Sequence, residues 1–544
     1  MVFAPLNTHS YYSFLEGLPS PQEWANAARA HGLPALALTD RWLTGAVEFY
    51  TACREAGVKP LLGLDVEVRL ESSAANVTVL ALNQNGWASL CALVSQLHAE
   101  GPLARAVPWA TMEANADGLL CIVDSDDDAA LTHLLTLFPQ RLYLGLRFSD
   151  EAGRLQMARA HNVPLVAAPP MFYLAPEEEA LQLTLTAIRL NEPRETLTAG
   201  DAVHRRAHFL SPAEFQARFA AVPQAITATL EIAERCQLEL PLGQHYYPQV
   251  NLTHGQTAQK DMHEKAYAGA ARLYGSVADE VGARLEKELQ VIEARGYAPL
   301  FLIMQEILEF ARQSGVPTAS RGSASSSLVA HCLGITTPDP IYHNLYFERF
   351  LNPARSTPPD IDTDLCSRRR EHVIRFVFDT YGHERVAMVG TINRFRERSA
   401  LRETGKAFGL APAEITKLAE WLPDRWGPPH LQARDTDAFA ELMQRFPQHA
   451  LMFSHAASLL EHPDHLSVHP GGVVITPGPL TARVPTFQAG KELPVTQMDL
   501  EAVEALAPNL YHDDTVQQVR RAVEARENGD LAEAFRKQLH ATGR

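Results

Sequence analysis

The sequence has few cysteines, no long apolar run and no surplus of basic charge. Its six cysteines are scattered and form no Cys-x-x-Cys pair: Cys53, Cys91, Cys121, Cys236, Cys332 and Cys366. A disulfide framework or a zinc knuckle is therefore not expected, and a reducing cytoplasm is the expected location. The opening "MVFAPLNTHS" has no basic segment, so we expect no signal peptide. No apolar run is long enough to predict a membrane span.

Basic residues are outnumbered, with 48 Lys and Arg against 64 Asp and Glu, for a net charge of −16. This balance argues against a surface that is coated with nucleic acid all over, but it leaves room for a local basic groove. The length of 544 residues, with 46% hydrophobic and 21% charged residues, suits a soluble chain of three or four domains.

Short apolar strands alternate with helices over residues 1–240, as in "ALALTD", "AVEFYTACREAG" and "VKPLLGLDVEV". This alternation predicts an α/β domain with a largely parallel sheet, either open or closed into a barrel. The segment 239–252 is rich in proline and aromatic residues and is expected to be a linker. The remaining expectations are a helical block at 256–313, helices at "LVAHCLG" and 368–380, a strand at "RVAMVGTI", mostly helices over 395–465, a turn and then a strand at "HPGGVVITPGPL", and a charged helix from about Thr515.

Three aspartates occupy alternate positions in "STPPDIDTDLCSRRR" (356–370): Asp360, Asp362 and Asp364. Side chains alternate faces along a strand, so a strand here would place all three on one face. Crowded carboxylates repel one another unless a cation binds among them, and hard oxygen ligands suit Mg²⁺. The pattern therefore suggests a phosphoryl-transfer site with two metal ions. A solvated acidic loop with nothing bound remains the alternative.

The second candidate segment is "ASRGSASSSLVA" (319–330), a glycine- and serine-rich turn before a helix. Such a turn exposes backbone N–H groups, and the helix dipole favours an anion there. Arg321 is a candidate phosphate contact, Gly322 would permit close approach of the backbone, and Ser323 supplies a hydroxyl. A serine-rich loop that merely caps the helix is the alternative.

A basic block follows the aspartates, because residues 368–406 contain ten basic residues against five acidic ones. Phosphate backbones attract such a patch in a salt-dependent way, although each arginine alone is as well explained by a solvated helix face. A phosphate-binding turn, a carboxylate strand and a basic block within about ninety residues match the needs of nucleotidyl transfer on a polyanionic substrate.

Three stretches together closely resemble the bacterial C-family DNA polymerase, the DNA polymerase III alpha subunit: "SRGSASSSLVAHCLGITTPDPIYHNLYFERFLNPARSTPPDIDTD", "GTINRFRERSALRETGKAFGL" and "HLSVHPGGVVITPGPL". The wording of "SYYSFLEG", "PPDID" and "RSALRETGKAFGL" is more similar to the error-prone, translesion branch. The resemblance covers roughly residues 1–506.

The resemblance implies a multidomain α/β architecture. A barrel of the polymerase-and-histidinol-phosphatase (PHP) type would span 1–240, followed by a nucleotidyltransferase-type α+β palm in two parts, 241–394 and 466–506. A helical thumb would be inserted at 395–465, and an atypical tail would occupy 507–544. The implied function is that of a template-directed DNA polymerase, which transfers a nucleotide from a dNTP to the primer 3′ hydroxyl in replication or error-prone repair.

The resemblance also implies roles for single residues. Asp362 and Asp364 would be the catalytic ligands of Mg²⁺, with Asp360 as a supporting metal ligand. The implied nucleotide-binding residues are Arg321, Gly322, Ser323, Arg394, Arg396, Arg398 and Lys406. The implied partners are primer–template DNA and dNTPs, together with other replication or repair subunits or a separate C-terminal polymerase polypeptide. No membrane partner is expected, and the expected location is cytoplasmic.

The N-terminal domain departs from the family's metal site. Residues that differ from the expected ligands are Pro5, Asn7, Arg41, Asp65, Pro170 and Phe172, and His9 alone remains of the opening histidines. A multinuclear hydrolase site cannot be assembled from the ligands that are left. We therefore predict a structural domain without phosphoesterase or proofreading activity. A retained site that uses Asp40 and His9 is the alternative.

A second departure follows "VTQMDLEAVEAL" (495–506), where the family continues into a strand with a third palm aspartate. Here "APNLYHDDTVQQ" follows, and nothing around Asp513 and Asp514 resembles that strand. We therefore expect a truncated polymerase or one half of a split polymerase. The alternative is a catalytically inactive protein that binds DNA or scaffolds a complex.

Overall fold

The computed structural model describes these parts of the chain: 2–70, 73–101, 104–147, 151–198, 200–201, 203, 206–244, 250, 252, 257–275, 278–351, 361–422, 438–489, 493–506 and 510–511. Asp360, Asp513, Asp514, part of the expected linker and the expected helix from Thr515 lie outside the described residues. Within the described parts, no helix is both long and apolar enough to span a bilayer.

The N-terminal domain is built on a seven-stranded sheet in the order β1-β2-β3-β5-β6-β7, with β4 paired to β2. The strands are β1 (Ala35–Leu38), β2 (Lys59–Arg69), β3 (Ala74–Ala81), β4 (Ala106–Pro108), β5 (Leu119–Asp124), β6 (Leu142–Leu146) and β7 (Leu165–Ala167). The sheet is mixed, because β3 runs antiparallel to both β2 and β5, whereas the remaining pairs are parallel. The prediction of a largely parallel sheet therefore missed β3, which returns directly beside β2 without a crossover helix.

Residues 5–9 tie the two edges of this sheet together. Pro5 and Thr8 accept hydrogen bonds from β1 on one side, while Asn7 and His9 exchange backbone hydrogen bonds with Met171, just after β7, on the other. The sheet is thereby curled, and its inner residues form a compact apolar core against helix α9 (Pro223–Arg235). This curl brings His9, Asp40 and Asp65 to one end of the sheet.

Helices cover the other face of the sheet. They are α1 (Pro21–Ala30), α2 (Ala46–Ala56), α3 (Gln84–Ala99), α4 (Trp109–Ala114), α5 (Asp128–Leu137), α6 (Glu151–His161) and α8 (Pro212–Arg218), whereas α7 (Glu179–Leu190) packs against helices within residues 395–459. Local sequence sets their ends. Ser20 and Glu23 form a capping box that starts α1, and Gly57, with φ 72°, ends α2 in the left-handed region.

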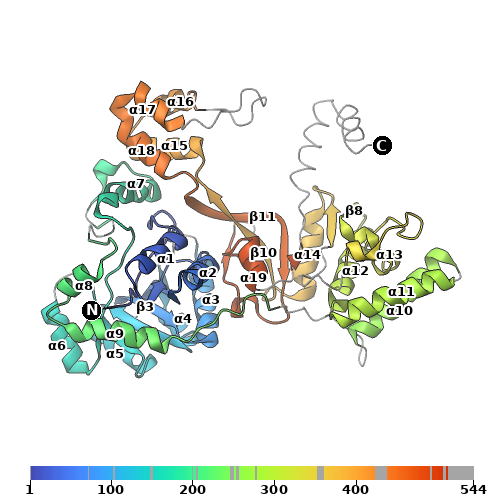
Figure 1. Cartoon of the computed structure of the whole chain (residues 1–544), viewed down its shortest axis with the longest axis horizontal. Coiled ribbons are helices and arrows are strands. Elements are labelled where there is room, and N and C mark those ends of the chain that lie inside the picture. The colour runs from blue at the N-terminus through green and yellow to red at the C-terminus, as the bar shows by residue number, and fades with distance from the viewer. Residues whose placement is uncertain are drawn as a thin grey trace.

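A helical unit with a short strand pair follows, at the opposite side of the molecule in Figure 1. It contains α10 (Ala258–Tyr274), α11 (Asp279–Ala294), α12 (Ala298–Gln313), β8 (Thr318–Arg321), a 3₁₀ turn (Ser323–Ser326), α13 (Leu328–Cys332) and β9 (Asp362–Leu365). Strands β8 and β9 pair only with each other among the described strands. Helix α14 (Arg370–Tyr381) then leads into the central sheet.

The central sheet has the order β12-β13-β10-β11-β14, with β10 (Val386–Arg394), β11 (Pro463–Ile475), β12 (Thr486–Gln488), β13 (Pro494–Thr496) and β14 (Leu510–Tyr511). Helix α19 (Leu500–Leu506) precedes β14. Between β10 and β11 the chain forms a separate helical unit, α15 (Glu397–Ala407), α16 (Pro412–Ala419), α17 (Ala438–Arg445) and α18 (Ala450–Ser458). In Figure 1 this unit lies beyond the long β10–β11 ribbon and next to α7.

Strand β11 differs from its expectation of a turn followed by a strand. It runs unbroken through "HPGG", but Met388 and Gly390 of β10 face Val473 and Val468, so extra residues bulge out of β11. The His469 ring accepts hydrogen bonds from the two following glycine N–H groups, which stabilises the bulge. Sequence alone cannot distinguish such a bulge from a turn, because both need glycine and a side chain that bonds to the backbone.

The N-terminal domain and the central sheet share one apolar core. Ala387, Val474 and Met498 of the central sheet region belong to the same cluster as the sheet-facing residues of the N-terminal domain. Polar contacts reinforce this junction, since the Trp87 indole donates to the Arg483 carbonyl at 2.9 Å. The helical unit α15–α18 is attached in the same way, because Leu185 of α7 lies in its core.

Candidate functional site

The glycine–serine turn and the aspartate strand lie side by side. Strands β8 and β9 are antiparallel, and their register places Arg321 opposite Asp362 and Ala319 opposite Asp364. The turn that follows β8 therefore begins at the level where β9 begins. Two segments some forty residues apart in the sequence thus meet at one end of this strand pair.

Gly322 gives the turn its shape. Its φ of 76° and ψ of −162° are accessible to glycine but rarely to other residues. The chain then enters the 3₁₀ turn at Ser323 and the short helix α13, which Ser327 caps by accepting from the Ala330 N–H group at 3.1 Å. Arg284 and the Ser327 hydroxyl both donate hydrogen bonds to the buried carboxylate of Glu288 on α11. The bond from Ser327 connects the end of the turn to that helix.

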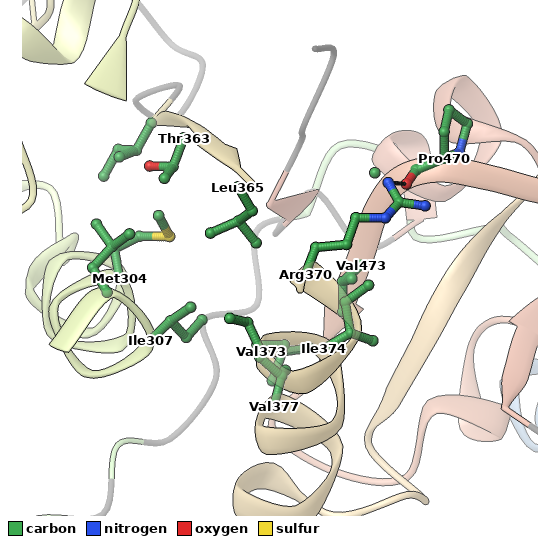
Figure 2. A pocket seen from close by; sticks show the side chains of 14 residues that line it. Met304, Ile307, Thr363, Leu365, Arg370, Val373, Ile374, Val377, Pro470 and Val473 are labelled. Atoms are coloured by element: carbon green, nitrogen blue, oxygen red, sulfur yellow. Dashed lines mark hydrogen bonds between the residues drawn. The ribbon is translucent and has the colours of Figure 1, made fainter. Parts of the chain in front are cut away.

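The alternation expected for the aspartate strand is visible in β9. Ile361, Thr363 and Leu365 all line one apolar cavity of about 80 Å³ behind the strand. Figure 2 shows Thr363 and Leu365 pointing toward side chains of α12 and α14. Because these positions point inward, the alternate position 364 points to the opposite face. Asp364 is partly exposed there, and only the backbone of Asp362 is described.

This cavity also separates β9 from the central sheet. Its far wall is formed by Gly471 and Val473 of β11, next to the bulge, where Arg370 donates to the Pro470 carbonyl. The β8–β9 pair is thus held against α12 and α14 by apolar contacts, with no strand pairing to β10 or β11 among the described strands.

The donors at β9 fit a hard divalent cation. Carboxylates on alternate positions of one strand present oxygen atoms on a single face, which is the ligand type that Mg²⁺ requires. Among the residues that the structure describes, no three His, Cys, Asp or Glu side chains gather into a ready ligand cluster.

The predicted nucleotide-binding residues fall into two groups. Gly322 and the backbone of Arg321 lie beside β9, whereas Arg394 ends β10 and Arg396, Arg398 and Lys406 belong to the start and body of α15, on the far side of the β10–β11 ribbon (Figure 1). The structure does not bring these groups together. Strand β10 carries the chain away from β9 before α15 begins.

Arg394 has a different environment from the one expected. Its guanidinium lies 5.5 Å from the centre of the Tyr11 ring, donates to the Tyr12 hydroxyl at 3.2 Å and donates to the Glu461 carbonyl at 2.8 Å. Arg394 therefore joins the N-terminal domain to the base of the helical unit. Its pKa is raised chiefly by the neighbouring Tyr12 and Tyr11, against the effect of its burial.

The remaining basic residues lie on the surface of α15. Arg396 pairs with Glu461, and Lys406 pairs with Glu403 at 2.9 Å, so part of their charge is neutralised within the helical unit. Arg398 lines a shallow cavity together with Arg402 and Glu420. These side chains form a basic face on the helical unit, away from the β8–β9 pair.

Side chains at and near the positions where the family resemblance implies metal ligands make other contacts in the N-terminal domain. The His9 ring is fully buried, stacks on Phe172 with ring centres 4.0 Å apart, and hydrogen-bonds to Asn7 at 2.8 Å and Ser13 at 3.1 Å. Burial lowers the pKa of His9 to about 4. Asp65 lies 3.9 Å from both His9 and Arg147.

Asp40 is likewise saturated by hydrogen bonds. Its carboxylate accepts from the Ser10 N–H group at 2.7 Å, from the Ser10 hydroxyl at 2.5 Å and from the Ser13 hydroxyl at 2.7 Å. Burial nevertheless raises its pKa to about 7, because these bonds only partly offset the loss of water.

Sequence reasoning missed one charged cluster nearby. Glu16 is buried and receives Arg41 at 3.1 Å, Arg189 at 3.4 Å and, more closely, Arg105. These arginines lower the pKa of Glu16 to about 2, although burial acts in the opposite direction. In the sequence, Arg41 stands out only because the family resemblance implies a histidine at its position. Arg105 and Arg189 carry no local motif, so no sequence signal identified them.

Both halves of the chain match models of known protein families. Residues 5–159 match the family model of the PHP domain, and residues 260–508 match that of the bacterial DNA polymerase III alpha NTPase domain. The error-prone DNA polymerase of Symbiobacterium thermophilum is 33% identical over 82% of this chain. That of Methylococcus capsulatus is 35% identical over 82%, and the DNA polymerase III subunit alpha of Bacillus subtilis is 31% identical over 93%.

The chain spans less than half the length of these curated relatives: 44%, 45% and 47%, respectively.

Proposed function

Since this chain belongs to the family of bacterial DNA polymerase III alpha subunits and error-prone DNA polymerases, we propose that it carries the nucleotidyl-transfer site of a template-directed DNA polymerase. The reaction is attack of a primer 3′ hydroxyl on a dNTP, in replication or in error-prone repair. The observation that supports this most is the register of β8 and β9, which sets the Gly322 turn beside Asp362.

Each part of this strand pair has a role in the proposal. The backbone after Gly322 and the Ser323 hydroxyl hold the triphosphate, and Arg321 contributes positive charge. Asp362 and Asp364 hold Mg²⁺ on the outer face of β9, and Asp360 supports them. Bound there, Mg²⁺ would activate the 3′ hydroxyl and stabilise the leaving pyrophosphate.

The helical unit and the N-terminal domain have supporting roles. We assign α15–α18 as the thumb and α10–α14 with the central sheet as the palm. The basic face with Arg398 and Arg402 then contacts duplex phosphates rather than the incoming nucleotide. The PHP domain is structural, because His9 and Asp40 are already saturated by Asn7, Ser10 and Ser13.

The test is Mg²⁺-dependent primer extension by this chain, alone and together with a polypeptide that supplies the remaining length of its relatives. Asp362→Ala and Asp364→Ala should abolish extension. Asp379→Ala is the matched control, because Asp379 is an exposed carboxylate on α14. Extension that survives both β9 substitutions contradicts the assigned roles.

A second candidate is a DNA-binding or scaffolding protein without catalysis. It is favoured by the cavity between β9 and β11, which keeps the aspartate strand out of the central sheet. Salt-dependent binding of primer–template DNA without any incorporation, even when the missing length is supplied, would support this candidate over the first.

A further inference from the structure

A second and larger cavity lies at the junction of the N-terminal domain with the central sheet. Its volume is about 580 Å³, within the range of roughly 300–1,000 Å³ typical of small-molecule sites. One wall comes from residues 13–16 and 41–42, and the other from residues 464–467 of β11 and 487–489 of and after β12. It shares no lining residue with the cavity behind β9.

The first wall is cationic. Arg41, Arg105 and Arg189 all line the cavity and converge on the single carboxylate of Glu16. Each guanidinium carries five N–H donors, so the two carboxylate oxygens of Glu16 cannot satisfy the donors of all three guanidinium groups. The Arg189 Nε atom is buried and makes no hydrogen bond among the described residues, although it lies only 3.4 Å from Glu16. The cluster therefore holds unused N–H donors.

Other carboxylates lie near these arginines, since Asp65 and Glu67 act on Arg41 and Asp201 acts on Arg189. Asp464 on the opposite wall is paired with His465 at 3.0 Å, and this pairing raises the pKa of His465. Asp65 approaches Arg41 from behind, but it also lies 3.9 Å from Arg147. The unused guanidinium donors therefore suit an anionic ligand.

The second property of the cavity is an aromatic wall. The Trp42 ring stacks on His98 with centres 3.5 Å apart, and Phe14 and Phe487 meet its edge at 5.6 and 5.8 Å. All four rings line the cavity. Trp42, His98 and Phe487 are largely buried in these contacts, so the half-buried Phe14 is the most accessible ring of the wall. An apolar, planar group fits beside it, whereas a bare inorganic anion would leave it unused.

We infer that this cavity binds a nucleoside phosphate without a metal ion, with the phosphate at Arg41, Arg105 and Arg189 and the base against Phe14. A guanidinium group binds phosphate oxygens through two parallel N–H groups, which the unused donors of this cluster can supply. The ligand would touch both the N-terminal domain and β11, so it would strengthen their junction. This inference does not depend on any chemistry at β9.

The experiment is isothermal titration of the intact chain with dAMP in EDTA, which removes the metal needed at β9. Inorganic phosphate and deoxyadenosine are titrated in parallel. Arg105→Gln should weaken dAMP binding about tenfold or more, as expected for one charge-assisted contact. Arg69→Gln is the matched control, because Arg69 is a similarly exposed arginine of the same domain, paired with Glu100 at 3.0 Å; it should leave the affinity unchanged.

Glu16→Gln supplies a change of the opposite sign. Removing the carboxylate frees three guanidinium groups, so dAMP should bind more tightly to this variant, provided that its melting curve shows it folded. If Glu16→Gln does not fold, the comparison of Arg105→Gln with Arg69→Gln decides alone. The inference is overturned if dAMP does not bind at millimolar concentration, if phosphate binds as tightly as dAMP, or if Arg105→Gln and Arg69→Gln bind dAMP equally.

Discussion

Thr363→Val should stabilise the protein, although it lies between the two proposed catalytic aspartates. The Thr363 side chain is only 8% exposed, and its hydroxyl has no hydrogen-bond partner among the described residues. A buried, unpaired hydroxyl costs about 1–3 kcal/mol, and valine replaces it with a methyl group of similar size. The neighbouring cavity of about 80 Å³ leaves room for that methyl group. We expect a gain of about 1–2 kcal/mol.

Calorimetry measures this gain as a rise of the melting temperature. For a unit of about 250 residues, 1 kcal/mol corresponds to roughly 2–4 °C, so the midpoint should rise by about 2–8 °C. Thr496→Val is the matched control, because Thr496 is a fully buried strand residue whose hydroxyl donates to Met498 at 2.6 Å and accepts from Gly390 at 2.9 Å. That variant should melt lower. A lower midpoint for Thr363→Val would refute the inward orientation of Thr363, and with it the outward face of the β9 carboxylates.

Three further predictions concern charge. Asp40 keeps its proton in the folded state up to a pH of about 7, whereas its pKa in the unfolded chain is 3.8. The free energy of unfolding of the parent therefore falls as the pH rises from about 4 to 7. In urea titrations, the stability of Asp40→Asn relative to the parent should increase across this range, and the difference should level off above pH 7. Replacing Arg398 and Arg402 by Gln should weaken binding of duplex DNA and lower the slope of log K against log salt by about 2, measured by fluorescence anisotropy. Arg394→Gln should destabilise the protein by about 1–3 kcal/mol, seen as a lower melting temperature, because it removes the contacts of Arg394 with Tyr11 and Tyr12.

Local patterns predicted much of the secondary structure. The alternation in "DIDTD" correctly predicted a strand that turns one face inward, because period-two burial is a property of the strand alone. The helical blocks before β8 and between β10 and β11 also followed from periodicity. The family resemblance, which the comparisons confirm, rests on long stretches of similar sequence and not on periodicity or charge.

Tertiary arrangement was harder to predict. Strand β3 runs antiparallel in the sheet, and no residue in "AANVTVLA" signals direction, since either direction buries the same face. Arg394 contacts Tyr11 and Tyr12, which lie more than 380 positions earlier in the chain, so no local pattern predicts this contact. Arg41, Arg105 and Arg189 approach Glu16 only in the folded chain, because they are far from it in sequence, and a short sequence window cannot reveal this.

The central claim is that the β8–β9 strand pair holds a divalent metal ion together with a nucleoside triphosphate. The most direct test is electron paramagnetic resonance titration of the intact chain with Mn²⁺ as a probe for Mg²⁺, in the presence of dATP. The parent and the control Asp379→Asn should bind the Mn²⁺–dATP complex alike, whereas Asp364→Asn should bind it at least about tenfold more weakly, as expected for the loss of a charged ligand. Equal binding by Asp364→Asn and Asp379→Asn would contradict the assignment of β9 as the metal-binding strand.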